Sequence, residues 1–215
     1  MTITEPVKVM GKIECKSGKV SISATDLLDL LSGAIIATGK DSSLPTLTGI
    51  FLESFSTETD EGGLSATATD RYRLITGKTH YKGDPFTALL FNKDAVEVIR
   101  ALKPIAKRKD PRAIVVSLSD RVITFTLPDQ TFNFRALDGT FPKYEYLLAK
   151  ETADSSKMAF NCSLLGSFDA IPTGEKGGRV PVIFTFHGNS SLVTFTVAHP
   201  VIAWRGGIMP MRYAN

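Results

Sequence analysis

Lysine and arginine side chains recur along one face of a predicted helix, where they could bind phosphate groups. The helix follows Asn92, and at about 100° per residue Lys93, Arg100 and Lys103 share one side of it. Pro104 is expected to end or kink the helix, and the loop beyond it adds positive charge at Lys107, Arg108, Lys109 and Arg112. Such a face is typical either of a solvated surface or of one that contacts nucleic-acid phosphates without reading bases, because no aromatic residues are interleaved for base stacking.

No arrangement of residues indicates catalysis. The segment Gly33–Lys40 resembles a phosphate-binding loop, but five residues separate its glycines instead of four, and Asp41 stands where Ser or Thr would bind magnesium. Its apolar interior is more typical of the end of an amphipathic helix with Gly39 as the C-cap. We therefore expect a protein that is not an enzyme and that uses no metal or other cofactor.

Histidine and cysteine are sparse and scattered. His80, His187 and His199 have neither metal-ligand spacing nor a neighbouring nucleophile, and we expect them at the surface or in turns. Cys15 and Cys162 are far apart and form no Cys-x-x-Cys pair, which argues against a disulfide framework and a cysteine zinc site. This cysteine usage fits a reducing, cytoplasmic setting.

The composition is that of an ordinary soluble protein. Of 215 residues, 43% are hydrophobic and 22% charged, which excludes disorder and a fibre. The apolar runs are too short to cross a bilayer, and Met1–Lys16 holds no signal-peptide core. We expect neither a membrane nor a secreted protein. The net charge of +3 is too small to indicate nucleic-acid binding by itself.

Three copies of one pattern, a strand leading into an amphipathic helix, repeat along the chain. The strands end at Ile22-Ser23, Phe91-Asn92 and Phe160-Asn161, so that each copy follows the last by 69 positions. Ser and Asn at these positions are suited to cap the helix that follows. After each helix the hydrophobic period changes from about 3.6 to 2, as in strands that bury one face.

The second and third copies are the most alike. Residues 122–127 lie 70 positions before residues 192–197, and Phe134-Arg135 lies 70 positions before Trp204-Arg205. Each copy is predicted to form strand, helix, strand, strand, strand. The fold class is therefore α+β, with helices on one face of antiparallel sheets.

One such unit cannot bury its apolar face alone, so the copies should pair, and the third copy lacks a partner. Self-association through an edge strand or an uncovered helix face is one expectation. A smaller third unit packed on the first two is the alternative.

Four segments of the chain resemble, in order, signature segments of the bacterial sliding clamp, the β subunit of DNA polymerase III. They are Leu47–Glu53, Ala66–Leu74, Leu137–Tyr144 and Ile208–Arg212. The resemblance extends from about Val20 to Arg212 and implies the DNA-clamp fold. The repeat agrees with it, because a clamp domain consists of two strand-helix-strand units.

The resemblance also predicts the domain organisation. Residues 1–150 resemble the middle clamp domain with two units, and residues 151–215 resemble the C-terminal half of the last domain. This economy of length suggests a phage or mobile element as the source. Because rings of this family close from six domains, or twelve units, a chain of three units would need four copies. We therefore expect a homo-oligomer, with a tetramer as the arithmetic expectation.

The family implies a ring around duplex DNA, lined by basic helices, that holds a polymerase on its template and catalyses no reaction. On this basis the basic residues of the second helix and the following loop would contact phosphates independently of sequence. These DNA-facing residues are Lys93, Arg100, Lys103, Lys107, Arg108 and Lys109.

The resemblance also implies a pocket, between the middle and last domains, for a short apolar motif of DNA polymerases and clamp loaders. Leu47, Leu74 and Leu147 would also be expected simply as core residues, and methionines suit a surface that accepts several partners. The matching positions are Leu47, Thr69, Tyr72, Arg73, Leu74, Pro142, Leu147, Met209, Pro210, Met211 and Arg212.

The chain departs from the family at the pocket. Arg71 stands where the family usually has glycine, and Tyr213–Asn215 extends past the usual terminus. The leading hypothesis is a compact DNA sliding clamp that serves as a processivity factor. The alternative is a clamp-like interaction protein, a decoy or cap of a host clamp, that binds clamp-binding peptides without encircling DNA.

Overall fold

The structure, a computed structural model, describes residues 17–56, 62–81, 83–108, 112–148, 158–174, 181–188 and 192–211. Some residues that carry predictions from the sequence lie outside these residues: Cys15, the DNA-facing Lys109, the pocket residue Arg212 and the extension Tyr213–Asn215. The predicted domain boundary at residue 150 also lies outside them.

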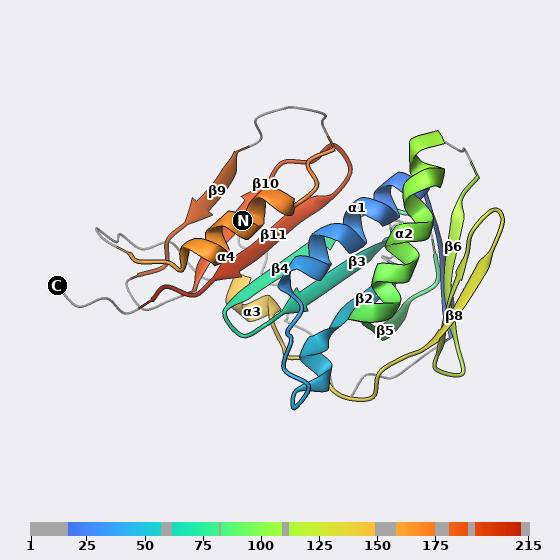
Figure 1. The fold of residues 1–215 in the computed structure, drawn as a ribbon, viewed down its shortest axis with the longest axis horizontal. Helices are drawn as coiled ribbons and strands as arrows, with labels where there is room; N and C mark the ends of the chain where they lie inside the picture. The colour runs from blue at the N-terminus through green and yellow to red at the C-terminus, as the bar shows by residue number, and fades with distance from the viewer. Residues whose placement is uncertain are drawn as a thin grey trace, which may run out of the picture.

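The chain forms the three predicted units, each with a helix followed by three strands (Figure 1). Unit 1 comprises β1 (Gly18–Ile22), α1 (Ala24–Ala34), β2 (Gly49–Ser56), β3 (Gly62–Thr69) and β4 (Arg73–Lys78). Unit 2 comprises β5 (Phe86–Phe91), α2 (Asn92–Arg108), β6 (Ile114–Ser119), β7 (Val122–Thr126) and β8 (Thr131–Arg135).

Unit 3 is smaller than the other two. Its helix is short, and its first strand is represented by a single bridge at Ala159. The unit comprises α4 (Cys162–Gly166), the 3-10 helix η3 (Ser167–Ala170), β9 (Val182–Thr185), β10 (Val193–Val197) and β11 (Ala203–Ile208). The remaining short helices are η1 (Ile35–Ala37), η2 (Pro45–Thr48) and α3 (Glu145–Leu148).

The strands form two antiparallel sheets. One sheet has the order β1-β6-β7-β8, and the other has the order β5-β2-β3-β4-β11-β10-β9. Helices α1, α2 and α4 lie on the same side of the longer sheet (Figure 1). The predicted α+β architecture is confirmed.

Helix α1 begins where the sequence predicts but ends earlier. The Ser23 side chain accepts a hydrogen bond from the Asp26 N–H, as an N-cap residue does. The helix ends at Ala34, so the prediction that Gly39 is its C-cap is wrong. The Gly39 N–H donates instead to the Leu47 carbonyl oxygen at 2.7 Å, in the connection to β2.

Helix α2 continues beyond Pro104 to Arg108, so Pro104 does not end it. A proline removes one helical N–H, but the residues on either side still pack: Leu102 is fully buried and Ile105 is 7% exposed. This packing holds the last turn in place. Lys107 and Arg108 therefore belong to the helix rather than to a loop.

The main core lies between the helices and the sheets. Alternate residues of β2, Ile50 and Leu52, point into it, as do Leu27 and Leu30 of α1. A second cluster lies on the other face of the longer sheet, where the chain from residue 137 to α3 covers it. This cluster contains Phe51, Leu74, Leu89, Phe141, Tyr144 and Leu148.

Unit 3 joins unit 1 through their fourth strands. Strands β4 and β11 pair antiparallel from Ala203 opposite Lys78 to Ile208 opposite Arg73. Within one chain the third unit therefore packs on unit 1, and self-association between copies stays a prediction. We call this junction the seam.

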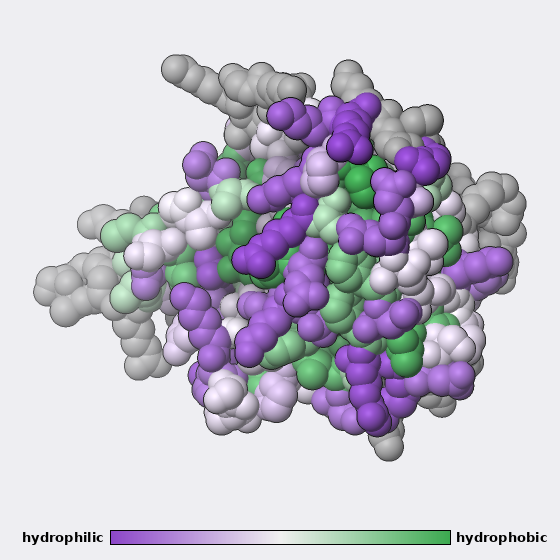
Figure 2. Space-filling view, turned by 45° about the vertical axis from the view of Figure 1, so that its right-hand side comes forward, coloured by the Kyte–Doolittle hydropathy of each residue, from purple (hydrophilic) through white to green (hydrophobic). Residues whose placement is uncertain are grey.

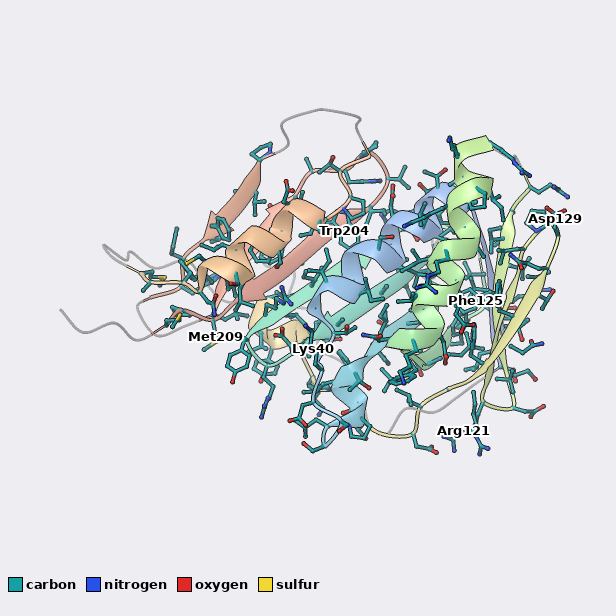
Figure 3. The ribbon with its side chains drawn as sticks, in the orientation of Figure 1. Lys40, Arg121, Phe125, Asp129, Trp204 and Met209 are labelled. Atoms are coloured by element: carbon teal, nitrogen blue, oxygen red, sulfur yellow. The ribbon has the colours of Figure 1, made fainter. Side chains whose placement is uncertain are left out.

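The side chain of Trp204, on β11, packs at the seam beneath α1 (Figure 3). Its indole is 1% exposed, and its Nε1–H donates to the Pro172 carbonyl oxygen at 3.0 Å. The ring packs against Gly33 of α1 and Gly77 of β4, where a Cβ atom would approach the ring to 2.2 and 2.4 Å. Glycine at both positions makes room for the indole.

His199 is buried at the seam rather than at the surface, with 2% of its side chain exposed. Its Nδ1 accepts the backbone N–H groups of Val201 and Ile202, so the proton lies on Nε2 and faces the Asp29 carboxylate at 3.3 Å. Burial raises the pKa of Asp29, and the hydrogen bond from His199 opposes that rise.

The structure corrects one equivalence suggested by the repeat. Phe134 pairs with Ile123 near the end of β8, whereas Trp204 pairs with Val197 near the start of β11. The 70-residue spacing therefore does not place them at the same register, because the connections before these strands differ in length. In the described part of the chain, no helix combines the length and apolar character needed to cross a membrane.

Candidate functional sites: a basic helix and the seam

Helix α2 presents a basic face to solvent. Its buried side consists of Ala95, Val98, Leu102 and Ile105. The predicted DNA-facing residues that the structure describes, Lys93, Arg100, Lys103, Lys107 and Arg108, are all exposed. Figure 2, which brings this side of the molecule forward, shows hydrophilic side chains over the helix face. Such an array can attract a phosphate backbone.

The charge is unevenly distributed. Along α2, Asp94 lies in the first turn and Lys107 and Arg108 in the last, which complements the helix dipole. Helices α1 and α4 contain no lysine or arginine. Unit 2 therefore supplies the basic helix, and the helices of units 1 and 3 do not.

The seam brings together pocket residues that are distant in the sequence. The Met209 N–H donates to the Tyr72 carbonyl oxygen at 2.9 Å, and Leu74 lies opposite Gly207. The Met211 N–H donates to the Ala159 carbonyl oxygen at 2.7 Å. The β3–β4 turn of unit 1 and the end of unit 3 thus form one surface, with Met209 at the end of β11 (Figure 3).

Large apolar side chains are exposed around the seam. Tyr72 is 59% exposed, Met209 38% and Met211 52%. Tyr146 of α3 is 57% exposed, and sequence reasoning missed it although it lies beside the predicted Leu147. Exposed aromatic and methionine side chains are typical of a surface that binds an apolar segment.

The other predicted pocket residues differ in how far their side chains are exposed. Leu47 and Leu74 are buried, Leu147 and Pro210 are half-buried, and Pro142 is exposed. Leu74 packs in the second cluster, in which the Phe51 and Phe141 rings stack at 5.1 Å. The second cluster thus forms a rigid support for the adjoining surface.

A tight turn holds Tyr72 in place. The Asp70 carboxylate accepts the N–H groups of Tyr72 and Arg73, and the Thr69 hydroxyl donates to the Arg73 carbonyl oxygen. Arg71 has a φ of 77°, in the left-handed region that favours glycine, which explains why a glycine suits this position. Its side chain is exposed and charges the surface beside Tyr72.

Arg73 is engaged within the protein. Its guanidinium forms an ion pair with Asp70 at 3.0 Å and donates to the Ser167 hydroxyl of η3. It therefore links units 1 and 3. The residue positions the seam, and its charge is largely satisfied there.

Two residues at the second cluster have shifted pKa values: Glu53, beside it, and Tyr144, which belongs to it. Burial raises the pKa of Glu53 on β2; the charge of Lys78 opposes this rise, and that of Glu145 adds to it. Burial also raises the pKa of Tyr144 to about 12, and its hydroxyl is within 3.1 Å of the Thr67 hydroxyl. Glu53 is thus a carboxylate held in an unfavourable environment.

We expect Glu53→Gln to stabilise the protein at pH 7. Because the folded-state pKa of Glu53 is raised, ionised Glu53 costs folding free energy above that pKa, and protonation removes the cost as pH falls. The gain in Tm over wild type should therefore shrink towards zero below the ordinary glutamate pKa of about 4.3. Thermal unfolding of both proteins at pH 7 and pH 4 checks this, with Asp169→Asn, which neutralises an exposed carboxylate away from Glu53, as control. A variant that is less stable at pH 7 would show that the attraction of Lys78 outweighs burial.

A cavity of about 210 Å³ lies on the outer face of unit 3. Its lining includes Thr185, Thr194 and Arg205, and Arg205 also donates to the Leu148 carbonyl oxygen at 3.0 Å. Sequence reasoning did not find it, because its lining is assembled from three paired strands and from Leu148 of α3.

The predicted absence of catalytic and metal sites remains a prediction from the sequence. Lys40 is exposed after η1 and belongs to no phosphate loop, since Gly39 bonds to Leu47. Among the residues described, no three His, Cys, Asp or Glu side chains gather as a metal site would require.

Comparison with known proteins identifies the relatives of this chain. The family described as "DNA polymerase III beta subunit, central domain" matches residues 19–143. The beta sliding clamp of Synechococcus elongatus is 29% identical over 133 residues, which are 61% of this chain and 34% of that protein. The beta sliding clamp of Synechocystis sp. is 25% identical over 181 residues, 79% of this chain and 42% of that protein. The chain thus matches roughly a third to two fifths of the length of these curated relatives.

Solved structures agree on the fold. The β subunit of DNA polymerase III from Thermotoga maritima matches with a TM-score of 0.72 at 16% identity, over 99% of this chain and 69% of that one. The predicted clamp fold is therefore confirmed. Sliding clamps are processivity factors rather than enzymes, in agreement with the sequence prediction. The family match, the order of the units and the shared fold together show that this chain belongs to the DNA polymerase III beta subunit family.

Proposed function

We propose that this chain is a DNA sliding clamp, a processivity factor that encircles duplex DNA in the cytoplasm as a homo-oligomeric ring and tethers a polymerase. The observation that carries the proposal is the exposed basic face of α2 in a chain of the sliding-clamp family. Lys93, Arg100 and Lys103 would make weak contacts to phosphates, and none of them would read a base. The test is retention on circular but not on linear DNA, because a ring that encircles DNA slides off only where the DNA has a free end.

The seam is proposed as the site that binds a polymerase or a clamp loader. Support comes from the exposed Tyr72, Met209 and Met211 on either side of paired strands, above a buried cluster. A short apolar peptide would bury these side chains, and the flexible methionines would adapt to different sequences.

We expect Met209→Ala with Met211→Ala to weaken binding of such a peptide by about tenfold or more, since two exposed apolar anchors are removed. Deletion after Ile208 should weaken it further. The measurement is fluorescence anisotropy of a labelled synthetic peptide that carries the C-terminal apolar motif of a replicative polymerase.

The matched control for the methionine variant is Val201→Ala. Val201 is 40% exposed in the connection at the other end of β11, so its loss should leave peptide affinity unchanged. Unaltered affinity in the methionine variant and in the truncated chain would place the peptide site elsewhere.

The ring requires several copies. We propose that residues 1–150 act as one clamp domain and residues 151–215 as half of another, so that four copies would supply twelve units. Four chains of 23.3 kDa have a mass of about 93 kDa.

One observation favours the alternative function, a decoy or cap that binds clamp-binding peptides without encircling DNA. Helices α1 and α4 have no basic residues, so a ring of these chains would carry positive charge on one helix in three. On this alternative, peptide binding persists and DNA retention is absent.

A further inference from the structure

Units 1 and 2 show how two units complete each other. The first strand of each unit pairs with the second strand of the other: β1 with β6, where Ile22 lies opposite Ile114, and β5 with β2, where Phe91 lies opposite Gly49. Helices α1 and α2 pack against each other on these sheets. The exchange is reciprocal, as in an approximate two-fold arrangement.

Unit 3 has the same two positions, but neither is filled by a described segment. Strand β9, its second strand, ends the longer sheet and pairs there with β10 alone. The segment Met158–Phe160, its first strand, makes one bridge, between Ala159 and Met211. In unit 1, β1 makes a comparable bridge to Gly83, which follows β4, the fourth strand of that unit. The other edge of β1 pairs with β6.

The burial of unit 3 is correspondingly incomplete. Residues Ile114 and Val116 of β6 are fully buried, whereas Val182 and Phe184 of β9 are half-buried. On the same edge, Ile183 is 58% exposed, and Phe186, just beyond it, is 39% exposed. Helix α4 has no buried residue, although α1 has seven.

The missing half is not supplied between units 2 and 3. Unit 2 is followed by α3, which ends at Leu148, and unit 3 begins at Met158. The nine residues between them are far fewer than the 69 that separate successive units. An exposed strand edge with apolar residues invites another strand.

We propose that unit 3 is completed by unit 3 of a second copy of this chain. Residues Met158–Phe160 of each copy pair as a strand with the free edge of β9 in the other copy. The two α4 helices pack together about a two-fold axis. The repeat gives the register. The cross-strand pair of Val116 and Phe125 in unit 2 corresponds to the pair of Phe184 and Phe195 in unit 3. Ile22 at the end of β1 corresponds to Phe160. Phe160 therefore lies opposite Val182 of the partner subunit.

The other end of the chain offers the second contact needed for a ring. Strand β8 is the fourth strand of unit 2 and ends the shorter sheet. Fourth strands already pair antiparallel at the seam, β4 with β11. Two β8 strands paired in this way, alternating with paired third units, would close a ring of four copies. This step deepens the proposed clamp function and rests on it, whereas the pairing of the third units stands without it.

The test is disulfide cross-linking of Phe160→Cys with Val182→Cys, in a chain that also carries Cys15→Ser and Cys162→Ser. Within one chain these positions are far apart. Val182 is aligned through Val197 with Trp204, while Ala159 bridges Met211, seven residues further along. At about 3.3 Å per residue the separation is roughly 20 Å, beyond the reach of a disulfide. Mild oxidation without DNA should therefore give covalent dimers of about 47 kDa, reversed by reductant.

The matched control is Phe160→Cys with Phe186→Cys, which is four residues out of register and should not cross-link. Equal cross-linking of the two pairs would overturn the proposed register. Light scattering of the unmodified chain, which needs no variant to fold, should give a mass near 47 or 93 kDa. A persistent monomer of 23.3 kDa would overturn the self-pairing and leave a domain of another clamp as the partner.

Failure of this inference can be distinguished from failure of the clamp function. The cross-link is measured without DNA, and Arg100→Glu with Lys103→Glu should leave it unchanged. Cross-linked dimers that are not retained on DNA would contradict the clamp function and keep the pairing. A chain that is retained on circular DNA but never cross-links in register would contradict the pairing and keep the clamp function.

Discussion

Reversing two charges on α2, Arg100→Glu with Lys103→Glu, is expected to abolish retention of the chain on duplex DNA and DNA-dependent processivity. Both side chains are exposed on the same face of the helix, and three positions apart they are near neighbours. Each reversal replaces an attraction to phosphate with a repulsion, and an oligomer multiplies the effect. We expect affinity at about 50 mM salt to fall at least a hundredfold. The slope of log affinity against log salt should become shallower by about 0.9 for each phosphate that is no longer neutralised.

The matched control keeps the same change in net charge. Lys19→Glu with Lys40→Glu alters exposed residues outside α2 and should leave retention nearly unchanged. Peptide binding at the seam should be intact in both variants, which excludes misfolding as the cause. Unchanged processivity in the α2 variant would contradict the assignment of this helix to DNA.

Removing the indole of Trp204 is expected to have the largest effect on stability. Trp204→Ala leaves a cavity beneath α1 and costs the hydrogen bond to Pro172, so we expect a loss of about 3–5 kcal/mol. For a chain of this size that lowers Tm by roughly 10 °C. Thermal unfolding followed by circular dichroism measures it.

Gly33→Ala tests the same packing from the other side. Alanine is the better helix former by about 1 kcal/mol, but its Cβ would stand 2.2 Å from the Trp204 ring, so we expect a net loss of about 1–3 kcal/mol. In the Trp204→Ala background the same change should be neutral or stabilising, because the ring is gone. Gly166→Ala, where nothing lies within 4 Å, is the control. Additive losses in the double variant would refute the packing of Trp204 on Gly33.

The repeat explains why much of the fold could be predicted from sequence. Ser23 and Asn161 cap helices as predicted, and the exposed Arg100 and Lys103 lie opposite the buried Val98 and Leu102. These features depend on local periodicity and on residues close in the chain.

The features that sequence reasoning missed depend on contacts between distant residues. The indole of Trp204 fits at the seam because Gly33 and Gly77 leave room for it. His199 is buried against α1, where its Nε2 faces the Asp29 carboxylate. Pro104 stays within α2 because Ile105 is held by the core. Tertiary packing overrides local signals at all of these positions.

The candidate sites were found for different reasons. The basic helix follows from periodicity, whereas the pocket residues came from the resemblance to clamps. The structure brings Tyr72 and Met209 together across the seam and adds Tyr146, which no local pattern distinguishes. Arg73 proves to be a link between units 1 and 3.

Retention on DNA circles tests the central claim most directly. The chain is first diluted to dissociated subunits and then concentrated with nicked circular duplex DNA, so that a ring can assemble around it without a loader. Gel filtration separates bound from free protein before and after the circle is cut once. We predict co-elution with the circle at moderate salt and release when the DNA is linearised. Equal retention on circular and linear DNA, or none on either, would contradict a ring that encircles DNA.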